Sequence, residues 1–401
     1  MPTVRLIESA DGWWCTLNGK AAHLPKEAVA AGSLVPQARE ALETKGFFAT
    51  SEPIFGLTVL TATSCNLGCA YCFQNVNETT ENPFAPARIA RRLLAQEDVS
   101  RIASFAQQRM DTLGFNRLFL LLFGGEPLLN PQGCLGLLDA LQPLGLDSAE
   151  MISNAVLLRP ALARQLNDAG LARIQVTFDG SRPEHDVTRV DHAGRGTYDK
   201  ILANVSDADA CTELAWHFRV NASHHNLDGI ENLIDDLASL RLQQPPTLHL
   251  AFIDDVGVGY HNHLRYTAEL TSRFTSLINR AFDHGMDVPV MGVSVADCPY
   301  CGQFAGGSGA VINADGTLAS CWETAGRPEW VVGNIHTGYL PEAQIANKWV
   351  ACRHEAQEHG DAEHSRRFYD SLDSLILDRT HRPTRTGTGT GPPEAVPASR
   401  H

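Results

Sequence analysis

Three cysteines lie close together in the segment Cys65-Asn-Leu-Gly-Cys69-Ala-Tyr-Cys72, directly after a β-rich run. Their spacing is C-x3-C-x2-C, and three thiolates on one loop can hold three of the four irons of a cubane. The fourth iron then has no protein ligand, so it is open to a small molecule that chelates through an amine and a carboxylate. The alternative is a zinc site, but zinc sites usually combine two C-x2-C pairs or Cys and His pairs, and no fourth ligand lies nearby.

A second group of cysteines lies nearer the C-terminus. Cys298-Pro-Tyr-Cys301 is followed by Cys321, which ends a G-x4-C segment, and then by Cys352. Disulfides are rare in cytosolic proteins, so the clustering of these cysteines favours metal or cluster ligation. These four thiols are enough for one further iron–sulfur cluster and too few for two. A structural zinc ion in the same four thiolates is the alternative.

The first cysteine loop needs a scaffold, and the sequence predicts one. Short β-rich runs alternate with helix-like stretches, which indicates parallel βαβ units. In such units the loops after the strands lie on one face, where active sites are built. The predicted strands are 56–64, 117–123, 149–154, 173–178, 215–221 and 247–253. The predicted helices lie near 88–112, 132–142, 159–169, 197–208, 229–240 and 264–284.

Six units are fewer than the eight of a full TIM barrel. The predicted fold class is therefore α/β, with a partial (β/α)6 TIM-type barrel over residues 51–255. Residues 1–50 are expected to form a small N-terminal unit. In this unit residues 4–7 and 13–17 pair as a hairpin, and a short helix covers 36–45.

Residues 256–379 are expected to form a helix followed by a cysteine-rich C-terminal extension. A helix over 342–352 would place Cys352 at a helix end. The tail 380–401 is rich in Pro, Gly and Thr and has almost no apolar residues, so we expect it to be disordered.

Two further motifs follow the predicted strands. Residues 124–127, Gly-Gly-Glu-Pro, come after the second strand, and residues 153–154, Ser-Asn, end the third. A carboxylate suits an ammonium group, and glycines allow close backbone approach, although a Gly-Gly-Glu-Pro sequence alone is also typical of a turn. Together with C-x3-C-x2-C, these motifs resemble the radical SAM superfamily over about residues 55–255.

The resemblance implies two cofactors and the residues that bind them. Cys65, Cys69 and Cys72 would hold a [4Fe–4S] cluster that reductively cleaves S-adenosylmethionine (SAM) to a 5′-deoxyadenosyl radical. Glu126 would take the methionine amino group, and Arg189 would pair with the carboxylate. The residues implied to contact SAM are Tyr71, Gly124, Gly125, Glu126, Ser153, Asn154, Asp179, Arg189 and Asn221. In that set Tyr71 lies near the adenine and Ser153-Asn154 near the ribose. For Asp179 and Asp186, capping of a helix or turn is the alternative.

The stretch from Asp179 to Asn204 is similar to a signature of one subgroup, which carries a C-terminal cluster domain called SPASM or, in shortened form, twitch. The SPASM pattern normally continues past G-x4-C with a longer cysteine array, and this chain lacks that array. The resemblance therefore implies a twitch-like extension. It would hold one auxiliary [4Fe–4S] cluster on Cys298, Cys301, Cys321 and Cys352.

Enzymes of this subgroup modify ribosomally made peptides, or oxidise a sulfatase residue or small alcohols. The resemblance implies a radical SAM oxidoreductase that oxidatively modifies, for example by crosslinking, a precursor peptide. The N-terminal unit would grip the peptide by strand addition. The electron donor would be a flavodoxin or ferredoxin. The alternatives are a twitch-type small-molecule alcohol dehydrogenase and formylglycine formation, although sulfatase maturases carry the longer cysteine array. A non-enzymatic iron–sulfur carrier would not need Glu126 or Arg189.

The composition restricts the classes of binding partner that we expect. The formal net charge is −14 and the isoelectric point is about 5.5, which argues against nucleic acid as a partner. No run of 18 apolar residues is present, so no membrane partner is expected. The N-terminus lacks an apolar signal core, which predicts a cytoplasmic protein.

Overall fold

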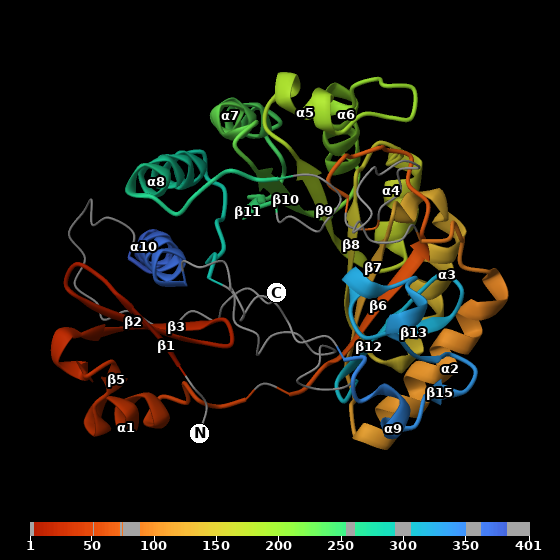
Figure 1. Cartoon of the computed structure of the whole chain (residues 1–401), viewed down its shortest axis with the longest axis horizontal. Helices are drawn as coiled ribbons and strands as arrows, with labels where there is room; N and C mark the ends of the chain where they lie inside the picture. Colours follow the sequence, from red (N-terminus) through yellow and green to blue (C-terminus); the bar gives the residue numbers. More distant parts are fainter. Residues whose placement is uncertain are drawn as a thin grey trace.

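The computed structural model describes residues 4–50, 52–72, 74, 89–253, 261–292, 306–349 and 362–382. Its centre is a curved sheet in which six parallel strands lie in the order β11-β10-β9-β8-β7-β6 (Figure 1). These strands are β6 (Phe55–Ala62), β7 (Leu118–Gly124), β8 (Leu146–Ser153), β9 (Leu171–Phe178), β10 (Ala215–Ala222) and β11 (Thr247–Phe252). All neighbouring pairs are parallel. The predicted partial (β/α)6 barrel is therefore confirmed.

Helices connect the strands and cover the outer side of the sheet (Figure 1). They are α2 (Gln96–Leu113), α3 (Pro131–Leu141), α4 (Pro160–Asp168), α5 (Arg182–Thr188), α6 (Tyr198–Asp209) and α7 (Ile230–Ser239). The sequence predicts all of them except α5. The 3-10 turns are η1 (Lys26–Ala28), η2 (Pro127–Leu129), η3 (Gln142–Leu144), η4 (Leu227–Gly229), η6 (Trp322–Thr324) and η7 (Pro328–Trp330).

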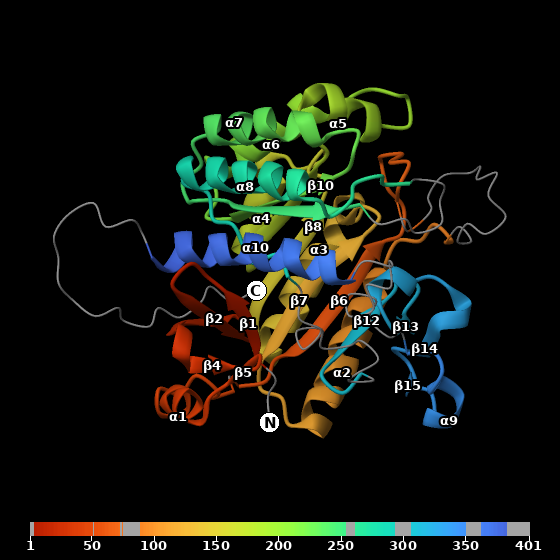
Figure 2. The same ribbon diagram turned by 60° about the vertical axis from the view of Figure 1, so that its left-hand side comes forward.

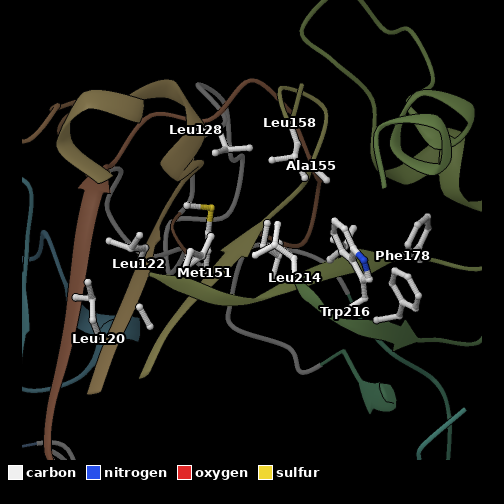
Figure 3. Close-up of a cluster of buried hydrophobic side chains, with 14 of the residues drawn as sticks. Leu120, Leu122, Leu128, Met151, Ala155, Leu158, Phe178, Leu214 and Trp216 are labelled. Atoms are coloured by element: carbon white, nitrogen blue, oxygen red, sulfur yellow. The ribbon is translucent and has the colours of Figure 1, made fainter. Parts of the chain in front are cut away.

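The main core lies between the sheet and these helices. Strand side chains such as Leu120, Met151 and Trp216 point into it and are almost fully buried (Figure 3). On β10 the residues that alternate with them are only half-buried, which is the period-two pattern of a strand with two different faces. Apolar burial on one face therefore fixes which side chains of each strand face the inside of the barrel.

The cysteine-rich extension continues the barrel sheet beyond β6. Strand β12 (Gly309–Ile312) pairs in parallel with β6, and β13 (Thr317–Ala319), β14 (Val331–Asn334) and β15 (Gly338–Tyr339) follow in antiparallel order. Helix α9 spans only Glu342–Ile345. The helix expected over 342–352 is therefore wrong in extent, because residues 346–349 turn so that Lys348 Nζ donates to Val331 O at 3.1 Å.

The N-terminal unit is a three-stranded antiparallel sheet with one helix. Its strands are β1 (Arg5–Glu8), β2 (Gly12–Leu17) and β3 (Lys20–Pro25), followed by the short pair β4 (Val29–Ala30) and β5 (Ser33–Leu34) and then α1 (Pro36–Thr44). The predicted hairpin and helix are confirmed. One sheet face packs Cys15 against Leu42 and Phe47.

The other face of this sheet packs against the C-terminal helix α10 (Ala362–His381), which also contacts α8 (Ala268–Asp283) (Figure 2). Leu377 of α10 clusters with Ile7 and Trp14. Arg5 pairs with Asp373 at 2.5 Å and with Asp370 at 2.7 Å. The first and last described segments of the chain thus pack together.

The start of the expected disordered tail needs correction. Residues 380 and 381 end helix α10, and the rest of the tail from 383 on lies outside the described residues. The extra turn is held by contacts with the N-terminal sheet: the ring of His381 lies 5.5 Å from that of Trp14, and Arg382 pairs with Asp11 at 2.8 Å. In the parts of the chain that the structure describes, no helix is long and apolar enough to cross a membrane.

Candidate functional site

The cysteine loop follows β6 at the carboxyl edge of the sheet, and the Gly-Gly-Glu segment at the end of β7 lies against it. Gly125 N donates to Ala62 O at 2.8 Å, and Glu126 N donates to Ser64 O at 2.9 Å. A Cβ on Gly124 would lie 2.1 Å from Ala62 O, and one on Gly125 would lie 2.4 Å from Ser64 O. The two glycines therefore allow close approach to the backbone of the cysteine loop itself.

A second segment, after α5, holds the opposite side of the loop. Gly68 N donates to Val190 O at 2.9 Å, and Leu67 forms a bridge with Asp191. The His192 ring donates Nε2–H to Cys65 O at 2.9 Å. Backbone contacts from two distant parts of the chain thus fix the loop.

The three thiols of this loop are buried or half-buried. Leu67 N–H donates to Cys65 Sγ at 3.4 Å, and Asn154 Nδ2 lies 3.7 Å from the same sulfur. Burial raises the pKa of Cys65 to about 12 and that of Cys69 to about 11, and the charges of the neighbouring cysteines add to the rise. Because cluster ligands are thiolates, loading the site must release these protons.

Glu126 lies at the centre of a nearly complete hydrogen-bond network beside Cys65. Its carboxylate is fully buried and accepts from Ser153 Oγ at 2.8 Å, from Asn154 N at 2.8 Å and from Leu128 N at 3.0 Å. Burial raises its pKa above the ordinary value, and these three hydrogen bonds oppose the rise. A carboxylate has about four acceptor positions, so about one remains for a further donor.

Tyr71 lies at the centre of a second network on the other side of the loop. Its hydroxyl donates to Asp179 Oδ1 at 2.8 Å and accepts from Arg189 Nη1 at 2.9 Å and Asn221 Nδ2 at 3.0 Å. Four residues predicted to contact SAM, from four separate segments, thus meet at one hydroxyl group. This central role of the Tyr71 hydroxyl was not predicted.

This second network is incomplete. Asp179 is fully buried and Arg189 is 8% exposed, yet Asp179 Oδ2 and Arg189 Nε have no hydrogen-bond partner among the described residues. Burial raises the pKa of Asp179 to about 6, against the opposing effects of Arg189 and of the Tyr71 bond. Buried polar atoms without partners are rare in native proteins, and an absent ligand is one explanation for them. These two atoms are therefore places where a bound molecule would be held.

The stretch between Asp179 and Tyr198 positions the second network. The ring of His185 is fully buried; it accepts from Asp179 N at 3.5 Å through Nδ1 and contacts Thr197 Oγ1 at 3.2 Å through Nε2. Thr197 Oγ1 in turn donates to Arg189 O at 2.7 Å, so His185 Nε2 carries the proton. Asp186 accepts from the backbone N–H groups of Thr197 and Tyr198 at the start of α6. It therefore caps that helix, which is the alternative role that the sequence left open for Asp186.

The residues of the first cysteine loop fit a cubane and its chelated ligand. In the described ranges no three His, Cys, Asp or Glu side chains converge on one point where a single metal ion would bind. A cubane does not require such convergence, because each thiolate ligates its own iron. The donor set of three neighbouring thiols, one remaining acceptor at Glu126 and the unpartnered atoms of Asp179 and Arg189 matches an amino acid chelated to an iron.

The second cysteine group is described at one position. Cys321 is buried and follows β13, directly before η6. The β12–β13 turn that leads to it contains Gly316 with φ +81°, a conformation that favours glycine. Cys298, Cys301 and Cys352 lie outside the described residues, so the auxiliary cluster stays a prediction.

Three site residues were missed by the sequence analysis. Gln74, two residues past Cys72, is 4% exposed and has no hydrogen-bond partner for either amide atom in the described part of the chain. His192 contacts the cysteine loop, and Arg219 donates Nε–H to Asn221 Oδ1 at 2.8 Å. Of these three residues only Arg219 could have been found from the sequence. It lies two residues before Asn221 on a predicted strand, and residues two apart on a strand share a face.

Comparison with known proteins gives a family match. Residues 59–237 match the family model of the Radical SAM superfamily. The GTP 3',8-cyclase of Heliobacterium modesticaldum is 27% identical over 215 residues, which cover 53% of this chain and 58% of that protein. The chain spans between 39% and 58% of the length of the first curated relatives it matches.

Solved structures show the same fold at low sequence identity. Native anSMEcpe with bound AdoMet has a TM-score of 0.61 and 14% identity, and the match covers 82% of this chain and 99% of that chain. Streptococcus suis SuiB bound to precursor peptide SuiA has a TM-score of 0.52 and 11% identity, covering 87% and 90%. The family model spans the cysteine loop and strands β7 to β10, and the fold of the solved structures agrees with it. Residues 59–237, which contain the cysteine loop and the Gly-Gly-Glu segment, are therefore similar to the radical SAM superfamily.

Proposed function

We propose that this chain binds a [4Fe–4S] cluster through Cys65, Cys69 and Cys72 and cleaves SAM reductively. The observation that carries the proposal is a pair of buried atoms, Asp179 Oδ2 and Arg189 Nε, that have no partner in the described ranges and lie near the thiols of the cysteine loop. When bound, the cluster supplies the electron that cleaves SAM into methionine and a 5′-deoxyadenosyl radical, which removes a hydrogen atom from the substrate.

The protein's own residues would bind and orient SAM. The remaining acceptor position of Glu126 suits the ammonium group, and Arg189 suits the carboxylate because a guanidinium can bind it through two N–H groups. Ser153 and Asn154 lie beside Glu126, where they would contact the ribose. Tyr71 and Asn221 would border the adenine side, with the Tyr71 ring held by its hydroxyl.

We further propose that the C-terminal extension is of the twitch type and holds one auxiliary cluster on Cys298, Cys301, Cys321 and Cys352. The burial of Cys321 after a sheet that continues from the barrel supports this. An auxiliary cluster would accept an electron from the substrate radical, so the net result would be a two-electron oxidation of the substrate.

The substrate we favour is a ribosomally made precursor peptide that is oxidatively crosslinked. The fold is shared with SuiB, which was solved with its precursor peptide. In the N-terminal unit both faces of the β1–β3 sheet are covered, by α1 and by α10. Among the described residues no strand pairs with the outer edges of β1 and β3, so a peptide strand could add there. Small-alcohol oxidation and formylglycine formation remain the alternatives in this fold.

A second candidate is chemistry on a nucleotide. The curated relatives that match by sequence are GTP 3',8-cyclases, which act on GTP. The matches cover about half of the chain or less. This observation favours a nucleotide over a small alcohol as the second substrate class.

The radical chemistry is tested by anaerobic reconstitution with iron and sulfide, followed by dithionite and SAM. We expect 5′-deoxyadenosine from the reconstituted chain and none from a variant with Cys65, Cys69 and Cys72 changed to Ala. Iron analysis should give about eight iron atoms per chain for two cubanes, and about four if only the first site is filled. A reconstituted chain that makes no 5′-deoxyadenosine would refute the proposal.

The substrate is tested separately. Co-expression with short open reading frames from the neighbouring genes should yield a peptide that has lost two hydrogen atoms, detected by mass spectrometry. Incubation of the reconstituted chain with GTP should leave GTP unchanged. Conversion of GTP, with no change in any peptide, would replace the peptide proposal by the nucleotide candidate.

A further inference from the structure

Strand β10 has two chemically different faces. Trp216, Phe218 and Val220 are buried and belong to the core beneath the helices, where Figure 3 shows Trp216. His217 and Arg219 alternate with them, so they lie on the opposite face of the sheet, and both are half-buried. This opposite face is the inside of the partial barrel.

The neighbouring strands extend this polar face. His217 lies opposite Gln175 of β9, and Arg219 lies opposite His249 of β11. Residues directly opposite each other in a sheet share a face. The rings of His217 and His249 are 5.7 Å apart. Gln175, His217, Arg219 and His249, all half-buried, form one patch, which we call the inner polar strip.

The other half of the inner face is apolar. Leu60, Leu121 and Phe123 cluster there with residues of β12 and β13, and Ile152 of β8 packs against them. Ile152 lies opposite Gln175, so the strip begins where the apolar half ends. The interior of a complete TIM barrel is filled mostly by bulky apolar side chains. A half-buried strip of Arg, His and Gln is unlike such a packed core and needs another explanation.

The strip is connected to the predicted SAM site. Arg219 Nε donates to Asn221 Oδ1 at 2.8 Å, and Asn221 Nδ2 donates to the Tyr71 hydroxyl at 3.0 Å. Arg219 is also close enough to Asp179 to favour its ionised form. Lower on the same face, Arg173 of β9 is paired with Glu150 of β8 at 3.1 Å. Arg219 is the arginine of the strip itself.

We propose that the inner polar strip is a substrate subsite that binds an anionic group, a carboxylate or a phosphate. A guanidinium binds either group through two parallel N–H bonds, and the two imidazoles can add hydrogen bonds. The apolar half of the barrel takes the uncharged part of the same molecule. The proposal rests on the proposed function, because it places the substrate's anionic group at Arg219, two residues before Asn221 on β10. It goes further by naming what the substrate must carry.

The test measures binding to the reconstituted full-length chain by fluorescence. The probes are three fluorescein-labelled hexapeptides, each with two phenylalanines, in which the polar residues are all aspartate, all asparagine or all lysine. The fourth probe is a fluorescent N-methylanthraniloyl GTP. We expect the aspartate peptide, GTP or both to bind more tightly than the asparagine and lysine peptides.

Variants assign the binding to the strip. Arg219→Gln should weaken binding of the anionic probe about ten- to hundredfold, because a charge-assisted hydrogen-bonded pair is lost. Arg219→Lys keeps the positive charge but lacks the two parallel N–H groups of the guanidinium, so it should weaken binding of this probe less. The double variant His217→Gln/His249→Gln should bind the anionic probe about three- to tenfold more weakly than the unchanged chain. The matched controls are Arg273→Gln and His284→Gln, exposed residues paired with Asp228 and Asp235 on the outer helices, and these should bind as the unchanged chain does.

Each result decides the proposal. Three results would overturn it. The aspartate and asparagine peptides bind equally well while GTP does not bind, or no probe binds at all. The third is that Arg273→Gln loses as much affinity for the anionic probe as Arg219→Gln does. Binding of GTP alone supports the strip and identifies its anion as a phosphate, which contradicts the peptide substrate. Iron content and thermal unfolding show whether each variant folds. Failure of the proposed radical chemistry appears in the 5′-deoxyadenosine assay and does not change these binding results.

Discussion

Two buried carboxylates lie on opposite sides of the cysteine loop, and their surroundings differ. Glu126 accepts hydrogen bonds from three donors, so its network is nearly complete. Asp179 accepts at one oxygen from Tyr71. Within the part of the chain that the structure describes, its other oxygen and the buried Nε of Arg189 have no partner. Complete hydrogen bonding stabilises a fold, whereas a gap in a buried network marks the place of a ligand. We therefore expect changes at Glu126 to affect folding most, and changes at Arg189 to affect SAM binding most.

The largest effect is expected from Glu126→Ala. Removing the carboxylate leaves Ser153 Oγ–H, Asn154 N–H and Leu128 N–H buried without an acceptor, so the free energy of unfolding should fall by about 3 kcal/mol or more. Urea denaturation measures the loss. The matched control is Glu363→Ala at an exposed helical ion pair, where the change should stay within about 0.5 kcal/mol. A loss at Glu126 no larger than the control's would show that this network does not stabilise the fold.

The next largest effect is the contribution of Asp179 to the pH dependence of the free energy of unfolding. Its pKa is about 6 in the folded chain and about 3.9 when unfolded. Between these values the folded state binds a proton that the unfolded state lacks, so this residue lowers stability by about 2–3 kcal/mol as pH rises from about 4 to 6. Asp179→Asn should abolish that part of the dependence, measured by urea unfolding between pH 4.5 and 7. Parallel pH curves for the two proteins would contradict the raised pKa.

Arg189→Lys tests the incomplete network. Lysine keeps the positive charge and loses the planar fork, so SAM affinity should fall about ten- to hundredfold. Equilibrium dialysis with labelled SAM on the reconstituted chain measures it, and the free energy of unfolding should change less than for Glu126→Ala. Arg195→Lys, at an exposed pair with Asp191, is the control and should bind SAM normally. Equal losses in the two variants would remove Arg189 from the SAM site.

The smallest effect is expected from His192→Ala. This exposed ring donates one hydrogen bond to Cys65 O at the edge of the loop, so the free energy of unfolding should fall by about 0.5–1 kcal/mol. Urea denaturation measures the change. A loss as large as that of Glu126→Ala would mean that the rim of the loop, and not the buried carboxylate, holds it in place.

The barrel could be predicted from sequence because short β-rich runs alternate with helix-like stretches along the chain. All eight residues of β6 are buried, which is typical of a parallel strand covered on both faces. Helix α10 was missed although its buried residues Phe368, Leu372 and Ile376 are four positions apart, which is helical spacing. Its packing partners Arg5 and Trp14 lie at the other end of the chain, and no local pattern indicates such a contact.

The site was predictable where residue type and strand position together determine the chemistry. Tyr71, Asp179, Arg189 and Asn221 were expected near one ligand, and the structure brings them to one hydroxyl group. Which of their atoms stay unpartnered depends on distances between separate segments, and no sequence pattern contains these. The two glycines of the Gly-Gly-Glu segment show the same limit, since they allow contact with the cysteine loop and their type alone did not identify that neighbour.

The packing of the N-terminal sheet against α10 has a consequence for the order in which the protein is made. More than 300 residues separate Phe48 from Ala362. At about 5–20 residues per second, a ribosome needs roughly 15–60 s to synthesise them. Throughout that interval the apolar face with Ile7 and Trp14 has left the ribosome, while Leu377, which covers it, has not yet been synthesised. This unit is therefore translated before the barrel and completed after it, and its uncovered tryptophan face is the surface that a nascent-chain chaperone would meet.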